Sequence, residues 1–231
     1  MEPKEILEDC KECLFKLACD YFISQSDFEM LFQSTVQQNY KKGEVILKQG
    51  MKGNHLVYLR KGIVKFNYED ANGKNLILTI SKSPTLLGLA NILNEDVNIF
   101  SIIAIEECSG CLIDMDNLKM LAFNNQIFML NILKMSTEMF RNSIFSFISL
   151  AHKQVYGRVA DILIYLSKDI YQSNQFVLSL SRQEIAEFAG CSKENVIYTL
   201  HNFDSDGIIK VSGKKIEIIS FERLFKISKS G

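Results

Sequence analysis

The sequence predicts an α+β fold in which an antiparallel β-roll is followed by a long helix and a winged helix-turn-helix. Short alternating apolar runs separated by glycines extend from about residue 28 to residue 112. Apolar residues then recur at helical spacing to about residue 151, and two short helical patterns with a following hairpin pattern occupy the C-terminal third. We therefore expect a cysteine-containing segment at 1–22, the roll at 23–123, the long helix at 124–151 and the winged element at 152–231.

The composition, 47% hydrophobic and 23% charged, is typical of a soluble globular protein. No apolar run approaches the roughly 18 residues that a membrane-spanning helix needs. The N-terminal residues MEPKEILEDC are too acidic and polar for a signal peptide. We therefore expect a cytoplasmic protein with no membrane partner, whose cysteines serve as thiols, metal ligands or redox groups rather than as disulfides.

The first 22 residues contain three cysteines with the spacing C-x2-C-x5-C, namely Cys10, Cys13 and Cys19. Three thiolates this close in sequence can converge on one soft metal site. A fourth ligand would come from one of the other cysteines or from a non-cysteine group. The other cysteines are Cys108, Cys111 and Cys191. The alternative interpretation is that the thiols are reduced and serve as small, partly buried hydrophobic side chains.

The roll is predicted from short runs rich in apolar and β-branched residues, with glycines at the turns between them. The expected strands are Val45–Leu47, Leu56–Leu59, Ile63–Tyr68 and Leu76–Ile80, with Ile99–Ile105 and Cys111–Ile113 as closing strands. Asn72-Gly73 favours a type I′ hairpin because both residues tolerate positive φ. The segment Leu86–Ile92 is expected to form a short helical turn.

The apolar period becomes helical from about Asn117 to Ala151, and the long helix is expected within this stretch at 124–151. Its seam alternates steps of three and four residues and consists of Leu130, Leu133, Thr137, Phe140, Ile144, Phe147 and Ala151. Such a heptad seam favours a two-stranded parallel coiled coil, and hence a homodimer formed through the helix 124–151. The alternative is an ordinary buried helix, because other faces of the same helix are apolar too.

The C-terminal part begins with an amphipathic helix at Val155–Tyr171 and continues into the stretch SRQEIAEFAGCSKENVIYTLHNFDSDG. Ser181 and Glu184 have capping-box spacing for a helix from about Arg182 to Ala189. Gly190 can adopt the positive φ that ends this helix, and Ser192 can cap a second one.

Two apolar runs, Ile208–Val211 and Lys215–Ile219, then bracket Ser212-Gly213-Lys214 as a β-hairpin, and Phe221–Ile227 closes the chain as a helix. Two short helices with a glycine turn and a following hairpin form a winged helix-turn-helix.

This element predicts double-stranded DNA as a partner, because the outer face of such a second helix meets base edges and phosphates in the major groove. The residues expected to contact DNA are Arg182, Ser192, Lys193, Glu194, Asn195, Ile197, Tyr198, His201 and Lys214. Residues 152–231 carry 11 Lys and Arg against 9 Asp and Glu, so affinity must depend on positioned contacts and on dimerisation. The alternative is a helical hairpin whose outer face is only solvated.

The most specific parts of the pattern are four segments: KKGEVILKQG, LVYLRKGIVKF, SRQEIAEFAGCSKENV and DGIIKVSGKKIEII. Their order resembles the CRP/FNR superfamily of bacterial transcription regulators over nearly the whole chain. The resemblance implies a double-stranded β-helix of the cyclic-nucleotide-binding type, a dimerisation helix and a winged DNA-binding domain, with RNA polymerase as a further partner.

Members that bind cyclic AMP carry a Gly-Glu pair for the ribose and, about ten residues later, an Arg for the cyclic phosphate. This chain has Gly88-Leu89, and Asn98–Ser101 supplies no Arg. Leu89 cannot accept a hydrogen bond from a ribose hydroxyl, and no cation is left to pair a buried phosphate. Cyclic AMP is therefore not expected as the effector.

The N-terminal cysteines match the spacing of the oxygen-sensing FNR members, which hold a [4Fe-4S] cluster with one further cysteine in the roll. The segment GCLIDMDNL aligns with that further ligand and favours Cys111 over Cys108. The resemblance thus implies a cluster on Cys10, Cys13, Cys19 and Cys111. It also implies that oxygen, redox state or nitric oxide shifts the dimer or domain equilibrium and thereby DNA affinity.

In the second helix of the winged element, the family usually has a Glu and, four residues later, an Arg that read base edges. Glu194 matches the first position, but Tyr198 replaces the Arg and cannot make a bidentate contact with guanine. A changed half-site is the expected consequence.

Two rival hypotheses concern the effector and the class of protein. The same regulator could respond to haem or to an organic ligand in the roll, where His55 is expected to be a surface loop residue. A dithiol oxidoreductase using Cys10-x-x-Cys13 is the rival from another class, but no βαβ unit precedes this pair. The sequence contains no evident catalytic constellation, so we do not expect an enzyme.

Overall fold

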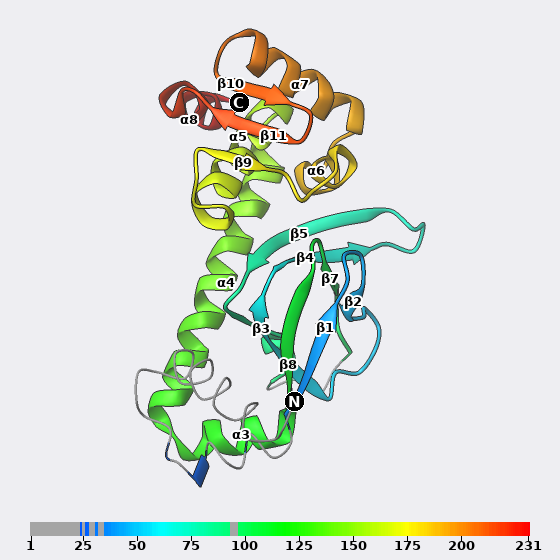
Figure 1. Cartoon of the computed structure of the whole chain (residues 1–231), viewed down its shortest axis with the longest axis vertical. Helices are drawn as coiled ribbons and strands as arrows, with labels where there is room; N and C mark the ends of the chain where they lie inside the picture. Colours follow the sequence, from blue (N-terminus) through cyan, green and yellow to red (C-terminus); the bar gives the residue numbers. More distant parts are fainter. Residues whose placement is uncertain (1–23, 25, 28–30, 32–34, 93–96) are drawn as a thin grey trace. The chain divides into compact units, whose positions relative to one another are not determined.

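The computed structural model describes residues 24, 26, 27, 31, 35–92 and 97–231, and the chain divides into two compact units. Unit 1 comprises the described residues up to Val64 together with Ser81–Arg141, and unit 2 comprises Lys65–Ile80 and Asn142–Gly231. Figure 1 labels their elements. The proposed cluster ligands Cys10, Cys13 and Cys19 lie outside the described residues, as does the rest of the predicted 1–22 segment.

The β-roll consists of two four-stranded sheets (Figure 1). The first has the order β1-β8-β3-β6, with β1 at Val36–Tyr40, β8 at Cys108–Asp114, β3 at His55–Lys61 and β6 at Thr85–Leu87. The second has the order β2-β7-β4-β5, with β2 at Val45–Leu47, β7 at Ser101–Ala104, β4 at Ile63–Glu69 and β5 at Asn75–Lys82. Strand β8 pairs antiparallel with both β1 and β3, so Cys111 lies opposite Gln37 on one side and Tyr58 on the other.

The turn between β4 and β5 differs from the predicted type I′ hairpin. Gly73 has a φ of 77°, but Asn72 does not take a positive φ, which the type I′ turn requires. The loop is instead closed by Asp70, whose backbone N–H donates to the Lys74 carbonyl at 3.0 Å. The Asp70 carboxylate also accepts from the backbone N–H groups of Asn72 and Lys74. Hydrogen bonds to the Asp70 carboxylate thus stabilise the turn without a positive φ at Asn72.

The segment Leu86–Ile92 is not the single helical turn that the sequence predicts. Its beginning belongs to β6, where Leu86 lies opposite Tyr58 of β3. Gly88 then reverses the chain with a φ of 93°, and the 3-10 helix η1 covers Leu89–Asn91. Pairing with β3 decides the conformation of the first residues, a tertiary effect that the local pattern does not contain.

The helical pattern from Asn117 to Ala151 corresponds to two helices, α3 at Met115–Asn124 and α4 at Gln126–His152, and α4 matches the long helix expected at 124–151. Asn125 breaks them with an extended conformation, φ −129° and ψ 100°. Its side-chain oxygen accepts from the backbone N–H of Phe128 at 3.0 Å, which satisfies a donor at the start of α4. The dimerisation helix expected at 124–151 therefore has its own beginning.

The core of unit 1 joins β-strand residues to α3 and to the first turns of α4. Cys111 belongs to this cluster, together with Met115 and Leu118 of the α3 region and Phe128 and Ile132 of α4. All five side chains are at most 5% exposed. One face of α4 is therefore fixed in the core of unit 1.

Unit 2 contains the winged helix-turn-helix. Its elements are α5 at Val155–Tyr165, the π-helical turn η2 at Leu166–Ile170, β9 at Gln175–Val177, α6 at Arg182–Ala189, α7 at Lys193–Ser205, β10 at Ile209–Ser212, β11 at Lys215–Ile218 and α8 at Phe221–Ser230. The predicted helix at 155–171 thus ends as an α-helix at Tyr165. The hairpin β10–β11 gains a third strand, in the order β10-β11-β9.

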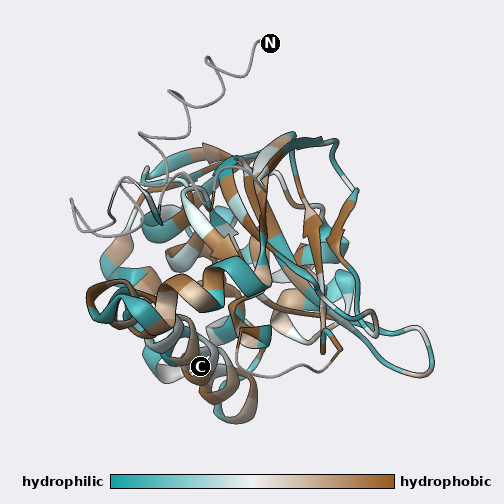
Figure 2. Ribbon diagram, turned by 90° about the horizontal axis from the view of Figure 1, so that it is seen from below, coloured by the Kyte–Doolittle hydropathy of each residue, from teal (hydrophilic) through white to brown (hydrophobic). Residues whose placement is uncertain are grey.

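Apolar residues follow the strands of the roll, whereas the loop joining β4 to β5 is polar (Figure 2). Among the described residues, no helix combines the length and the apolarity that crossing a membrane would demand.

Candidate nucleic-acid interface

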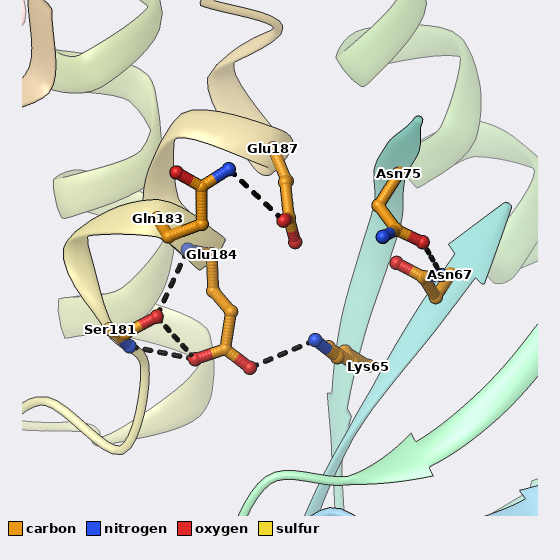
Figure 3. Close-up of polar contacts among 7 residues, drawn as sticks. All are labelled: Lys65, Asn67, Asn75, Ser181, Gln183, Glu184 and Glu187. Carbon is orange, nitrogen blue, oxygen red and sulfur yellow. Dashed lines mark hydrogen bonds and ion pairs between the residues drawn. The ribbon is translucent and has the colours of Figure 1, made fainter. Parts of the chain in front are cut away.

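The interface begins with a capping box at the start of α6, as the sequence predicts. The hydroxyl of Ser181 accepts from the backbone N–H of Glu184 at 3.2 Å, and the carboxylate of Glu184 accepts from the backbone N–H of Ser181 at 2.8 Å (Figure 3). Two otherwise unsatisfied donors are bonded reciprocally, which fixes where the helix starts.

The turn between α6 and α7 depends on Gly190, which has φ 58° and ψ 44°. A Cβ atom here would lie 2.9 Å from Cδ2 of Leu150 and 3.4 Å from Nη1 of Arg158. Both the backbone conformation and the close approach therefore favour glycine. After the turn, the Ser192 hydroxyl accepts from the backbone N–H of Asn195 at 3.2 Å and caps α7.

Helix α7 has one buried and one exposed face. The buried residues are Val196, Thr199, Leu200 and Phe203. The predicted DNA contacts on this helix and its cap are all exposed: Ser192, Lys193, Glu194, Asn195, Ile197, Tyr198 and His201. Ile197 and Tyr198 are 49% and 62% exposed, so both side chains are accessible to a partner. An apolar side chain at the head of a recognition helix can contact a thymine methyl group.

The acidic residue of this face, Glu194, is held in its ionised form. Hydrogen bonds from its own backbone N–H and from Ser192 lower its pKa below the usual value for glutamate. An ionised carboxylate at this position can accept from the amino group of cytosine. Tyr198 lies edge-on to Tyr156, with 6.4 Å between ring centroids, so one side of its ring is supported.

Arg182 and Lys214, the other predicted contacts, differ in their surroundings. Arg182 is partly buried and donates from Nη2 to the carbonyl of Gly213 at 2.9 Å, linking the start of α6 to the tip of the wing. Lys214 is exposed at that tip. Arg182 therefore positions the wing, while Lys214 projects from it.

Further residues hold the interface in place without having been predicted from the sequence. Asp204 of α7 accepts from the backbone N–H of Val211 at 2.8 Å and ties the helix to β10. Arg223 donates to the Asp206 carbonyl at 2.7 Å. Asp204 and Arg223 lie 7 and 17 residues from their partners, and no local pattern signals such pairs.

An ion pair joins β4 to the capping box. Nζ of Lys65 lies 2.9 Å from Oε1 of Glu184, and the two side chains are 13% and 20% exposed (Figure 3). Burial opposes ionisation of Glu184, but hydrogen bonds from Ser181 and Lys65 and the charge of Lys65 outweigh it, so its pKa is lowered. The charged pair therefore persists at neutral pH.

The three cysteines of the described residues have different surroundings. Cys108 is buried, and its sulfur lies 3.4 Å from the carbonyl oxygens of both Ile63 and Glu106, either of which can accept its one S–H proton. Burial is the largest influence on its pKa, which is raised. Cys191 is half-buried in the α6–α7 turn, and burial raises its pKa too, against the charge of Arg158. Cys111 is 1% exposed in the core of unit 1. Within the described residues, no group of three or more His, Cys, Asp and Glu side chains is placed to hold a metal ion.

The structure describes residues 88–92 and 97–101 of the stretch where the resemblance would place cyclic-nucleotide contacts. Leu89 is buried. Asn91 donates to Oδ1 of Asn98, whose amide in turn donates to the Lys48 carbonyl at 3.0 Å. A cavity of about 10 Å³, room for about one water molecule, lies beside Gly88, Asn91 and Asn98. A larger cavity of about 370 Å³ is lined by Leu89, Ala90 and Ile92 together with residues of α3 and α4. His55 is exposed at the first position of β3, not in a loop.

Comparisons with known proteins agree with this architecture. A family model described as a cyclic nucleotide-binding domain matches residues 37–125, and one described as a Crp-like helix-turn-helix domain matches residues 157–227. The structure of FixK2 from Bradyrhizobium japonicum superposes with a TM-score of 0.78 at 20% identity, covering 85% of this chain and 98% of that one.

Two relatives show similarity in sequence. The transcriptional activator protein Anr of Pseudomonas protegens is 27% identical over 217 residues, which is 91% of this chain and 88% of that protein. The cAMP-activated global transcriptional regulator CRP of Pasteurella multocida is 26% identical over 183 residues, 78% of this chain and 88% of that protein.

Proposed function

Because the chain belongs to the CRP/FNR family of DNA-binding transcription regulators, we propose that it couples DNA binding to oxygen, redox state or nitric oxide through a [4Fe-4S] cluster. The proposed ligands are Cys10, Cys13, Cys19 and Cys111. The observation that carries the proposal is the C-x2-C-x5-C spacing, joined to a buried cysteine at the end of the roll. When bound, such a cluster supplies a reaction with oxygen or nitric oxide that releases its thiolate ligands.

The surroundings of Cys111 suit the fourth ligand better than those of Cys108. The Cys108 sulfur lies against the backbone of Gly62, where a Cβ atom would be only 2.4 Å away, so Cys108 is tightly packed in place. Cys111 lies among apolar side chains of the unit 1 core, where water is excluded. An apolar, water-poor shell is one means by which proteins tune a cluster.

Cys111 is connected to α4 through packing. It shares one core with Phe128 and Ile132 of α4, and the chain passes from β8 through Asp114 directly into α3. A change in the environment of Cys111 therefore alters the side chains that fix the first turns of α4. This route requires no contact between the cluster and DNA.

We further propose that α4 forms a symmetric homodimer. Its seam residues Leu130, Leu133, Phe140 and Phe147 are between 58% and 70% exposed, although they are large and apolar. The one polar seam residue, Thr137, donates its hydroxyl to the Leu133 carbonyl and so has its hydrogen bond satisfied within the helix. Two copies of the winged element could then engage two half-sites together, with RNA polymerase as the further partner that the family resemblance implies.

Anaerobic purification and reconstitution test the cluster. We expect visible iron–sulfur absorption with about four iron atoms per chain, lost in Cys13→Ser and Cys111→Ser and retained in the matched controls Cys108→Ser and Cys191→Ser. DNA affinity of the wild type should change on exposure to air. Absence of the absorption, or its persistence in Cys13→Ser and Cys111→Ser, would refute the proposal. Addition of cyclic AMP should leave DNA affinity unchanged.

A further inference from the structure

A cavity of about 320 Å³ lies within unit 2, beneath the turn of the helix-turn-helix. Its walls come from α4, α5 and α6, with Thr79 contributed by β5. This volume falls in the range of small-molecule sites, about 300–1,000 Å³. The cavity is separate from Cys111 and from the residues near Gly88, so neither the proposed cluster nor a cyclic nucleotide accounts for it.

Most of the cavity wall is apolar and aromatic. Phe145 and Ile148 line it from α4, Ile162 from α5 and Phe188 from α6. The Phe188 ring meets Tyr165 edge-on, with 6.1 Å between centroids. The hydroxyl of Tyr165 donates to the Ile80 carbonyl, so it turns its polar atom away from a ligand. Such walls favour a ligand with an apolar body.

One of the two cations in the lining is already neutralised. Nζ of Lys153 lies 2.7 and 2.9 Å from the two carboxylate oxygens of Asp161. The same carboxylate accepts from the hydroxyls of Ser149 at 2.6 Å and Ser228 at 2.5 Å. Because Asp161 is saturated with donors, it neither needs a ligand cation nor leaves Lys153 with a free charge.

The other cation of the lining, Arg158, is not paired with a carboxylate among the described residues. Its Nη1 donates to the Gly190 carbonyl over a long 3.3 Å, and its Nε is buried with no hydrogen-bond partner. A buried N–H group without an acceptor destabilises the folded state, because it has lost its hydrogen bonds to water. A guanidinium in an apolar site is satisfied best by a carboxylate, which can accept two parallel hydrogen bonds.

We propose that this cavity binds a small organic monocarboxylate, whose carboxylate pairs with Arg158 and whose apolar body lies against Phe145, Ile148 and Phe188. The site is compatible with the proposed dimer. Successive helical residues are about 100° apart, which places Phe145 and Ser149 on the side of α4 away from the seam residues Ile144 and Phe147. Ile148 lies about 40° from Ile144 around the helix, so the ligand would contact the face centred on Phe145 and Ser149 and reach the edge of the seam only at Ile148.

The test uses the full-length protein with phenylacetate, 3-phenylpropionate and 4-phenylbutyrate, each compared with its neutral amide. At a concentration of about five times its Kd, a carboxylate should raise Tm by about 2–4 °C. Each amide should have a Kd at least tenfold higher than that of its acid. Arg158→Gln should weaken carboxylate binding at least tenfold. The matched control Arg141→Gln changes an exposed arginine of α4 outside the cavity and should bind as the wild type does.

A second variant separates binding from folding, because Arg158 also contacts the Gly190 turn. Ser146 lines the cavity, and its hydroxyl makes no hydrogen bond within the described residues. Ser146→Phe should therefore fill the cavity while leaving Arg158 intact. We expect loss of carboxylate binding in this variant with its Tm in buffer near that of the wild type. No carboxylate-dependent stabilisation, equal binding of acids and amides, or wild-type binding by Ser146→Phe would overturn the proposal. The cluster proposal is unaffected by these outcomes, since its readout is iron–sulfur absorption.

Discussion

The ion pair between Lys65 and Glu184 can be tested by a double-mutant cycle. Lys65→Met removes the ammonium group and keeps most of the apolar stem, while Glu184→Gln removes the charge and keeps an acceptor for the capping box. The two side chains are 13% and 20% exposed and 2.9 Å apart, so each charge depends on the other for much of its compensation. The quantity of interest is the coupling free energy of the pair.

The structure predicts that the two single substitutions are unequal. After Lys65→Met, Glu184 still accepts from the backbone N–H and hydroxyl of Ser181. We expect this variant to lose about 1–2 kcal/mol of unfolding free energy. After Glu184→Gln, Lys65 retains its charge without a carboxylate partner in the described part of the chain, and we expect a loss of about 2–3 kcal/mol. The coupling energy should be about 1–2 kcal/mol.

The pH dependence follows from the lowered pKa of Glu184, in which burial opposes ionisation but hydrogen bonds and Lys65 outweigh it. A group with a lowered pKa in the folded state stabilises the fold above its unfolded pKa. That contribution disappears as the pH falls through the folded value. The coupling should therefore be full at pH 7 and vanish in acid, where Glu184 is protonated.

Denaturant unfolding followed by circular dichroism measures these differences for the wild type, the two single variants and the double variant. The C-terminal unit must be followed by its own transition, because a chain with two units need not unfold in one step. A coupling energy below about 0.3–0.5 kcal/mol, the scatter of independent sites, would refute the role of the pair. A greater loss in Lys65→Met than in Glu184→Gln would refute the assigned asymmetry.

Three further predictions concern the recognition helix, the seam and the turn. Glu194→Ala should relax the base preference at one position per half-site in a DNA selection experiment. An unaltered preference would show that the Glu194 carboxylate does not contact a base. Phe140→Glu should convert the dimer to a monomer, as measured by light scattering after size-exclusion chromatography. The control Phe145→Glu changes a similarly exposed residue on another face of α4 and should leave the dimer intact. If Phe140→Glu remains a dimer, the predicted seam is wrong. Gly213 has a φ of 59° with open space around a Cβ atom, so Gly213→Ala should lower the unfolding free energy by about 1 kcal/mol. Gly190 has a φ of 58°, and a Cβ atom there would lie 2.9 Å from Leu150, so Gly190→Ala should lower it by about 1–2 kcal/mol more. Equal losses would show that the close contact with Leu150 is unimportant.

The sequence predicts the helix-turn-helix most accurately, because its signals are local. Ser181 and Glu184 are three residues apart, and Gly190 marks the end of α6 by itself. Each of these choices can be made from a window of a few residues. The bounds of α6, predicted at about Arg182–Ala189, are those observed.

Features that depend on distant partners were not predicted. Strand β1 reads VQQNY, with little apolar alternation, and takes its conformation from pairing with β8. The break at Asn125 is the exception, because its side chain caps the backbone N–H of Phe128 only three residues away, a local signal hidden inside a helical pattern. Lys65 and Glu184 are 119 residues apart, so nothing in the sequence around either one indicates the pair. The cavity at Arg158 likewise requires three helices to be placed together.

The exposed seam of α4 has a consequence for how much of the protein a cell must make. Association of identical chains is second order in their concentration, so at low abundance the concentration of dimers able to occupy two half-sites at once rises more steeply than the total chain concentration. Large apolar side chains such as Phe140 and Phe147, 66% and 70% exposed in the isolated chain, are also recognised by chaperones and proteases when they stay uncovered. We expect unpaired copies to be degraded faster than dimers, so that the rate of synthesis would affect the regulator alongside any chemical signal.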